Sequence, residues 1–167
     1  MTQTNETTAT TNQTANHNPA AESSRQKHNL IKPGYGYGVV WRLRYLANAV
    51  NFLSRELERL KTGQCAFDEH QTAGFNEALF CLGQETESVR NELLSSEGAE
   101  VFQNVLKSIR QAENHFTFLM IALNPDGYEE PRCLNERDIP SLHLNLGGIE
   151  NALSDALKQM ESQIKKH

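Results

Sequence analysis

The amino-acid sequence predicts an all-α fold, an antiparallel four-helix bundle that follows a disordered N-terminal tail. Three observations carry this prediction. In four segments, large apolar residues recur in alternating steps of three and four, the spacing of a helix that buries one face. The segments have similar lengths, and three are joined by short links, as in antiparallel bundles. Residues 1–30 hold almost no large apolar side chain, so they cannot offset their ordering entropy.

The chain divides into a polar tail, residues 1–30, and a bundle, residues 31–167. A length of 167 residues suits one domain of this kind. The formal net charge of −5 disfavours nucleic acid as the main partner. The tail lacks an apolar signal core, and no stretch approaches the ~20 apolar residues of a membrane span. We therefore expect a cytoplasmic protein that does not contact membranes.

The cysteines fit a reducing compartment. Cys65, Cys81 and Cys133 are odd in number and irregularly spaced, so they give no disulfide framework. Cys81 lies in an apolar stretch, and we expect it to be a small core residue.

The first predicted helix covers residues 39–62. Pro33 and the alternating glycines of residues 31–38 should prevent a helix before Gly38, and Tyr35 and Tyr37 should fold back onto an end of the bundle. The apolar seam of this helix is Val39, Leu43, Leu46, Val50, Leu53, Leu57 and Leu60.

The second predicted helix covers residues 69–95. Asp68 and Gln71 have the spacing of a capping box. Thr86 is the one polar residue of the seam, and we expect its hydroxyl to bond the carbonyl of Leu82 one turn earlier. The alternative is a buried site that holds a water or ligand. The seam is Phe75, Leu79, Leu82, Thr86, Val89 and Leu93.

Two further helices complete the bundle, at about residues 97–123 and 139–166. Ser95 or Ser96 should cap the third helix. In the fourth, Gly147 and Gly148 either allow close helix approach or split off its first turns. The two seams are Phe102, Val105, Ile109, Ala112, Phe116, Leu119 and Leu123, then Leu142, Leu146, Ile149, Leu153, Ala156, Met160 and Ile164.

Charge is segregated between the first two helices. Residues 39–62 carry five Lys or Arg and two Glu, whereas residues 66–97 carry seven acidic residues and one Arg. One interpretation is that the two helices lie side by side and their flanks attract each other. The other is that the acidic flank contacts a partner protein; the candidate contacts are then Glu77, Glu85, Glu87 and Glu92, of which Glu85 and Glu92 share one flank.

An aromatic and basic cluster begins the first helix. Aromatic rings beside guanidinium groups can hold phosphates, single strands or a protein partner. The alternative is packing, because Trp41 and Tyr45 are one turn apart and could extend the buried face. Arg42 and Arg44 should point to different sides. The candidate patch for an anion or partner is Tyr35, Tyr37, Trp41, Arg42 and Arg44.

No metal site or cofactor site is predicted. No His has Glu three residues before it, which argues against a di-metal carboxylate bundle. Cys65 and His70 lack the further ligands of a zinc site. The sequence also has no Walker loop, no serine elbow and no convincing pair of catalytic acids. This pattern favours a non-enzymatic protein.

Two Arg–His pairs have a spacing known from one superfamily of nucleases. They are Arg110 with His115, and Arg137 with His143. The predicted architecture resembles the four-helix bundles of the HEPN superfamily, which often carry Arg-x(4–6)-His. That resemblance implies RNA cleavage by Arg137 and His143 across a dimer. The aromatic residue common after the His in that family is absent here. Otherwise His115 is a packed, hydrogen-bonded residue beside the third seam, and His143 is a polar flank.

The sequence therefore favours a non-enzymatic helical regulator, adaptor or inhibitor that binds another protein through a bundle surface. One alternative is a HEPN-like RNase or toxin–antitoxin component. Another is a secreted effector whose unstructured N-terminal tail is its signal. Seams of this kind also permit a homodimer that shares helices.

Overall fold

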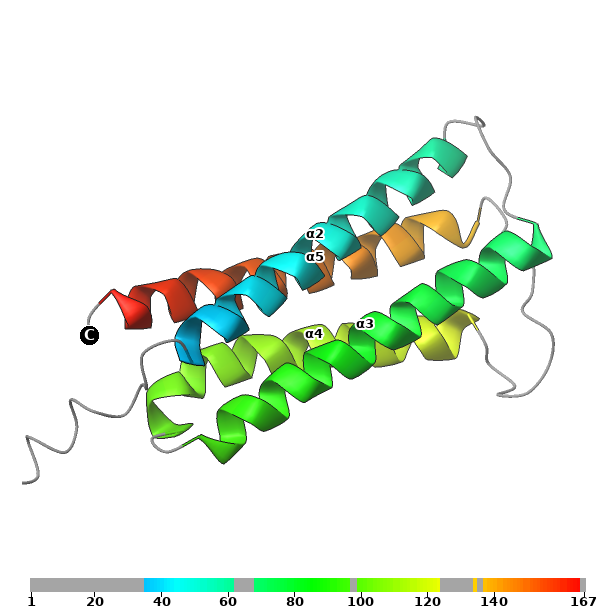
Figure 1. Ribbon diagram of the computed structural model, residues 1–167. Helices are drawn as coiled ribbons and strands as arrows, with labels where there is room; N and C mark the ends of the chain where they lie inside the picture. Colours follow the sequence, from blue (N-terminus) through cyan, green and yellow to red (C-terminus); the bar gives the residue numbers. More distant parts are fainter. Residues whose placement is uncertain (1–34, 62–67, 97–98, 124–133, 135–136, 166–167) are drawn as a thin grey trace, which may run out of the picture.

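A computed structural model describes residues 35–61, 68–96, 99–123, 134 and 137–165. Four long helices, α2 (Tyr35–Lys61), α3 (Glu69–Ser95), α4 (Gln103–Leu123) and α5 (Ile139–Ile164), pack as an antiparallel bundle, and the short 3₁₀ helix η2 (Ala99–Phe102) precedes α4 (Figure 1). The predicted fold class is confirmed. The predicted tail, residues 1–30, lies outside the described residues, as do Cys65 and Cys133.

The four helices contact each other unequally. α5 packs extensively on both α2 and α4, and α3 packs on α4 to a smaller extent. Among neighbouring helices, α2 and α3 share the least contact. α2 and α5 form one layer of the bundle, and α3 and α4 form the other (Figure 1). The C-terminal end of α2 lies far from the N-terminal end of α3 in the same view. The seam between α2 and α3 is therefore the most open of the four.

The predicted seams form the core. Within the described side chains every seam position is buried except Ile164, which is half-buried at the end of α5. Thr86 is fully buried and its Oγ1 donates to the carbonyl of Leu82 at 2.7 Å. That bond confirms the packing interpretation of this polar seam residue. Cys81 is exposed, so the prediction that it belongs to the core is wrong.

α2 begins at Tyr35, four residues earlier than its glycines predict. A Cβ at Gly36 would lie 2.7 Å from Cδ1 of Ile164. Gly36 thus allows the start of α2 to approach the end of α5, and this packing offsets a helix cost of roughly 1 kcal/mol. Tyr37 is exposed on the helix and does not fold back onto the bundle.

The ends of α3 follow one prediction and contradict another. Asp68 Oδ1 accepts from Gln71 N at 2.8 Å, and Asp68 N donates to Gln71 Oε1 at 3.1 Å, which confirms the capping box. Ser95 and Ser96 instead donate their hydroxyls to carbonyls in the last turn of α3. Those bonds satisfy orphan carbonyls of α3, so neither serine caps the next helix as predicted.

α5 runs unbroken through Gly147 and Gly148, which settles the choice in favour of close approach. A Cβ at Gly148 would lie 2.7 Å from the ring of His115 on α4. His115 Nδ1 lies 3.0 Å from Asn145 Oδ1, and this confirms His115 as a packed, hydrogen-bonded residue. No helix in the described part of the chain is long and apolar enough to cross a membrane.

Candidate binding surfaces

Arg42 joins α2 to α3 at one end of their seam. Its Nε donates to Glu85 Oε1 at 2.5 Å, one terminal nitrogen donates to Ser88 Oγ at 2.8 Å, and the other bonds Glu92 Oε2. Glu85, Ser88 and Glu92 are spaced three and four residues apart, so they share one face of α3. One guanidinium thus contacts three side chains of the facing helix.

The electrostatics of this cluster are those of an internal ion-pair network. The hydrogen bond to Glu85 raises the pKa of Arg42 above its usual value, with further contributions from the charges of Glu85 and Glu92, against the opposing effect of burial. Arg42 therefore stays charged. The prediction that the basic flank of the first helix meets the acidic flank of the second is confirmed.

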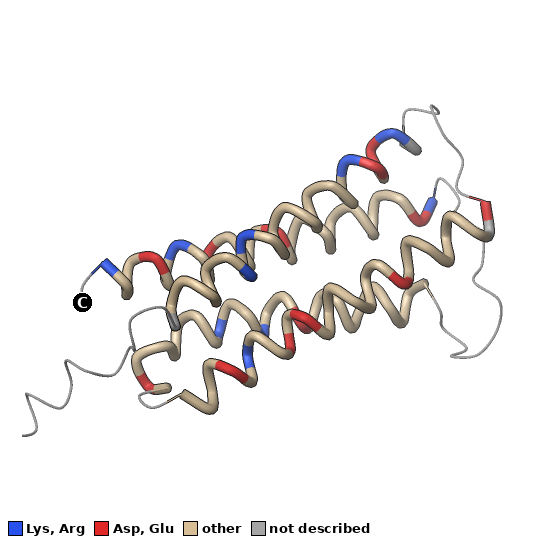
Figure 2. The backbone as a smooth tube through the Cα atoms, viewed as in Figure 1, with Lys and Arg blue, Asp and Glu red and all other residues tan. Residues whose placement is uncertain are grey.

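Several candidate site residues of both helices form ion pairs within the chain. Glu85 and Glu92, two candidate contacts for a partner, are bonded to Arg42 within the chain. Arg44 points to the opposite side of α2 and pairs with Glu161 of α5 at 2.8 Å. Figure 2 shows acidic positions along α3 opposite basic positions on α2. The two arginines of the predicted patch are thus directed at neighbouring helices.

The aromatic residues of the same patch face solvent. Tyr37, Trp41 and Tyr45 are 69%, 67% and 53% exposed. The rings of Trp41 and Tyr45 stack with centroids 6.1 Å apart and planes within 10°. The interpretation that they extend the buried face is wrong. They are offset by two residues from the core positions of α2, which turns them about 200° away. The side chain of Tyr35 is outside the described set.

These aromatic residues belong to a longer row on α2. Phe52 is 61% exposed in the same row, and Arg55 and Arg59 are exposed at its C-terminal end. The row repeats in steps of three and four and contains no acidic residue. We name it the α2 outer face; it consists of Tyr37, Trp41, Tyr45, Asn48, Phe52, Arg55 and Arg59.

A groove of about 290 Å³ borders this face where α2 and α3 separate. Phe52, Leu53 and Glu56 line it from α2, and Gln71, Gly74, Phe75 and Ala78 line it from α3. A Cβ at Gly74 would meet nothing within 4 Å, so the missing side chain leaves open space in the groove. The α2–α3 seam is therefore closed by Arg42 at one end and hollowed beside Phe52 at the other.

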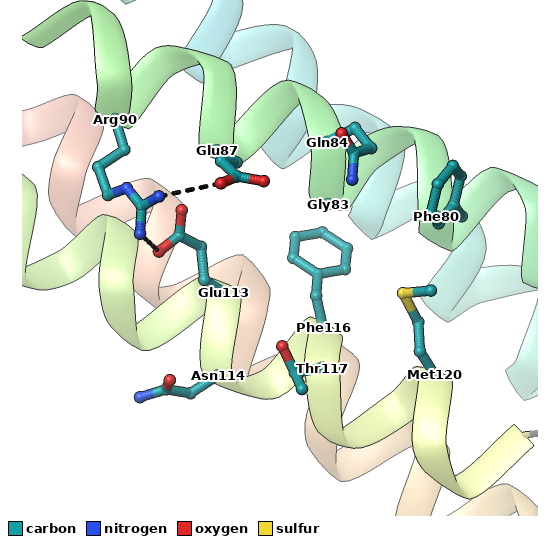
Figure 3. A pocket seen from close by; sticks show the side chains of 10 residues that line it. All are labelled: Phe80, Gly83, Gln84, Glu87, Arg90, Glu113, Asn114, Phe116, Thr117 and Met120. Carbon is teal, nitrogen blue, oxygen red and sulfur yellow. Dashed lines mark hydrogen bonds and ion pairs between the residues drawn. The ribbon is translucent and has the colours of Figure 1, made fainter. Parts of the chain in front are cut away.

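A second cavity, of about 370 Å³, lies between α3 and α4. Phe80, Phe116 and Met120 lie toward one end, and Arg90, Glu87 and Glu113 toward the other (Figure 3). Gly83 forms part of its lining. The cavity therefore combines an apolar end with a charged end.

The charged residues at this end of the cavity form ion pairs with one another. Arg90 donates to Glu113 Oε2 at 2.9 Å and to Glu87 Oε1 at 3.1 Å. Burial raises the pKa of Glu113 above its ordinary value, and the charge of Glu87 raises it further, while Arg90 lowers it. Among the described residues, Glu113 Oε1 and Arg90 Nε are buried and have no hydrogen-bond partner. This cluster fastens α3 to α4, as Arg42 fastens α3 to α2.

The remaining candidate residues, Glu77, Arg137 and His143, lie in separate parts of the bundle. Glu77 accepts a weak bond from the thiol of Cys81 at 3.7 Å. His143 is half-buried, and its Nδ1 lies 3.2 Å from Ser54 Oγ on α2. Arg137 is exposed in the turn before α5. Of the HEPN-like pair, Arg137 thus lies in an exposed turn, whereas His143 lies beside Ser54 across the α2–α5 contact.

Among the described residues, no three His, Cys, Asp or Glu side chains are grouped closely enough to hold a metal ion. Comparisons of the chain with models of protein families, with curated proteins and with solved structures give no match. The fold and its surfaces are therefore the basis on which a function can be proposed.

Sequence reasoning missed the groove beside Phe52, the cavity between α3 and α4, and the orientation of the aromatic row. Each hollow lies between two helices, with Gly74 or Gly83 of α3 in its lining, and its form depends on how the helices pack against each other. The aromatic row had a readable signal. Tyr37, Trp41 and Tyr45 recur every four residues, two residues out of phase with the seam, and that phase alone places them opposite the core.

Proposed function

We propose that this protein is a non-enzymatic binding module, a regulator, adaptor or inhibitor, that acts by docking its α2 outer face against another protein. The observation that carries the proposal is the exposed Trp41–Tyr45 stack. Exposed aromatic residues grouped on one face are typical of protein interfaces, where Trp and Tyr are enriched among the few residues that dominate the binding energy.

The size of the row supports the same function. Four aromatic rings that are each more than half exposed offer roughly 400–600 Å² of surface. A patch of that size matches the largest one on a typical monomer, which is often functional. Other exposed apolar residues of the described helices, such as Phe118 and Leu144, do not form a comparable row.

The acidic surface predicted from sequence is a weaker candidate. Glu85 and Glu92 already pair with Arg42 within the chain, so a partner would gain less from pairing with them. The aromatic rings of the row face solvent.

The proposal is tested by affinity capture from an extract of the source organism. The Trp41→Ser/Tyr45→Ser variant should lose the proteins that the unaltered chain retains. Phe118→Ser is the matched control, because Phe118 is 52% exposed on α4 and outside the α2 outer face. Circular dichroism establishes that each variant folds. An identical set of captured proteins for all three chains would refute the proposal.

A further inference from the structure

We infer that the partner element recognised by the α2 outer face is an acidic amphipathic α-helix, anchored by a large apolar side chain in the groove beside Phe52. This inference rests on the proposed function and specifies its partner. It combines four features of the described structure: the shape of the face, its charge, the groove next to it and the space at Gly74.

The shape of the face suits a helix. Its residues lie in one straight row along α2, and from Tyr37 to Arg59 the row extends about 33 Å at the rise of an α-helix. A partner helix of about 20 residues would follow most of that length. Such a helix presents apolar residues every three or four positions, which matches the spacing of the aromatic rings. A helix laid against an apolar surface is also a recurrent mode of peptide recognition.

The charge of the face selects an acidic partner. Arg55 is exposed and forms no ion pair within the described part of the chain. Arg59 is exposed beside it and bonds Glu56 of the same helix at 3.1 and 3.2 Å. No carboxylate stands in the row itself. Because Glu56 offsets Arg59, Arg55 carries the positive charge available to a partner at this end. A partner carboxylate would be attracted to Arg55, and a partner lysine would be repelled by it.

The groove supplies an anchor point. Phe52 belongs both to the α2 outer face and to the lining of the groove, so the two surfaces are continuous. Leu53, Phe75 and Ala78 make the groove largely apolar, and Gly74 leaves room in it. A leucine- or phenylalanine-sized side chain from the partner would be desolvated there, and anchors of this kind dominate the energy of interfaces.

A second copy of this chain fits the face less well. In a two-fold symmetric contact the same surface meets itself, so the basic ends of two α2 helices would both have to find carboxylates that their own row lacks. Single-stranded nucleic acid would match the arginines and rings, but it would make no use of an apolar groove. Both alternatives are outcomes of the experiment below.

The test uses three synthetic peptides of about 20 residues, a length that follows the row. The first is an amphipathic helix with leucines on one face and glutamates beside them. The second has lysine in place of each glutamate, and the third has serine in place of each leucine. Binding to the full chain is followed by the fluorescence of Trp41, the only tryptophan, and by anisotropy of labelled peptide.

The acidic helix should bind at least about tenfold more tightly than the basic helix and should shift the Trp41 emission to shorter wavelength. The serine peptide should not bind. Gly74→Leu, which fills the groove, should weaken the acidic helix about tenfold or more, whereas Gly74→Ala should leave its affinity unchanged. Arg55→Glu should narrow or reverse the preference for the acidic helix. Gly74→Leu acts on the groove and Arg55→Glu acts on the charge of the face. If one of these variants fails to fold, the other still tests the inference.

Several results would overturn the inference. One is equal or tighter binding of the basic helix, and another is unchanged affinity in both Gly74→Leu and Arg55→Glu. Tighter binding of a labelled single-stranded oligonucleotide would assign the face to nucleic acid, and a dimer that Trp41→Ser dissolves in light scattering would assign it to a second copy. If no peptide binds while Trp41→Ser/Tyr45→Ser still abolishes capture from extract, the inference fails and the proposed function stands.

Discussion

Arg42 Nε lies 2.5 Å from Glu85 Oε1, and this pair joins the two neighbouring helices that share the least contact. The other neighbouring helices share more contact, although ion pairs such as Arg90–Glu113 also join them. Between α2 and α3 the apolar contact is smaller, so a polar network has a larger share in setting how the helices lie. Arg42 also pairs with Glu92, so two of the acidic residues of α3 are engaged within the chain.

Replacing Arg42 should therefore cost more than replacing another paired arginine of α2. Arg42→Met leaves Glu85 and Glu92 without their shared counter-charge, and we expect the free energy of unfolding to fall by about 1–3 kcal/mol. Arg44→Met is the matched control, because the Arg44–Glu161 pair is largely exposed and should contribute less than about 1 kcal/mol. Urea denaturation measures both values. Equal losses would contradict the special role of Arg42.

Two adjacent glycines of α5 should respond oppositely to alanine. A Cβ at Gly147 meets nothing within 4 Å, so Gly147→Ala should raise the free energy of unfolding by roughly 0.5–1 kcal/mol through helix propensity. A Cβ at Gly148 would press on the His115 ring, so Gly148→Ala should lower it by about 1–3 kcal/mol. Thermal unfolding of the two variants compares them directly. A stabilising Gly148→Ala would show that α4 and α5 do not approach closely there.

Glu113 should give the stability of the protein a specific pH dependence. Burial raises its folded-state pKa above the ordinary value of 4.5, so the folded protein binds this proton more tightly than the unfolded chain. The resulting stabilisation is fully present below that ordinary value and is lost as the pH rises through the folded-state pKa.

Glu113→Gln cannot titrate at this position. Glu87→Gln keeps Glu113 but removes a charge that raises its pKa, so it should show the same pH dependence to a smaller extent. Between pH of about 4 and about 7, the free energy of unfolding of the unaltered protein should decline relative to that of Glu113→Gln. A difference that stays constant across this range, or that changes in the other direction, would contradict the raised pKa.

Two buried threonines of α3 differ in how their hydroxyls are satisfied. Thr72 Oγ1 has no hydrogen-bond partner among the described residues, whereas Thr86 Oγ1 bonds the carbonyl of Leu82 at 2.7 Å. Thr72→Val should therefore raise the free energy of unfolding by about 1–2 kcal/mol. Thr86→Val should raise the free energy of unfolding less, because it removes the hydrogen bond to the carbonyl of Leu82. Chemical denaturation measures the free energy of unfolding of both variants. A larger increase for Thr86→Val than for Thr72→Val would contradict this prediction.

The sequence predicts the helices and the core well, because the steps of three and four at positions such as Leu43, Leu79 and Ile149 depend only on helical geometry. It also predicts local features such as the Asp68–Gln71 capping box. The start of α2 was predicted too late because the glycine penalty is local, whereas the packing of Gly36 on Ile164 is tertiary and overrides it.

The candidate surfaces are predicted less well for a related reason. Arg42 and Trp41 are neighbours in sequence, but they point in different directions: one is drawn to α3 and the other faces solvent. Grouping them into one patch by sequence proximity joins two separate surfaces. The groove at Gly74 depends on how far apart α2 and α3 lie, which no pattern within either helix specifies.

The most direct test of the central claim is site-specific photo-crosslinking in the source organism. A photoreactive phenylalanine analogue replaces Tyr45 on the α2 outer face or Phe118 on α4, both of which are about half exposed. We predict that the Tyr45 position crosslinks to a discrete partner protein and that the Phe118 position does not. Crosslinks from Phe118 alone, or the same products from both positions, would contradict docking through the α2 outer face.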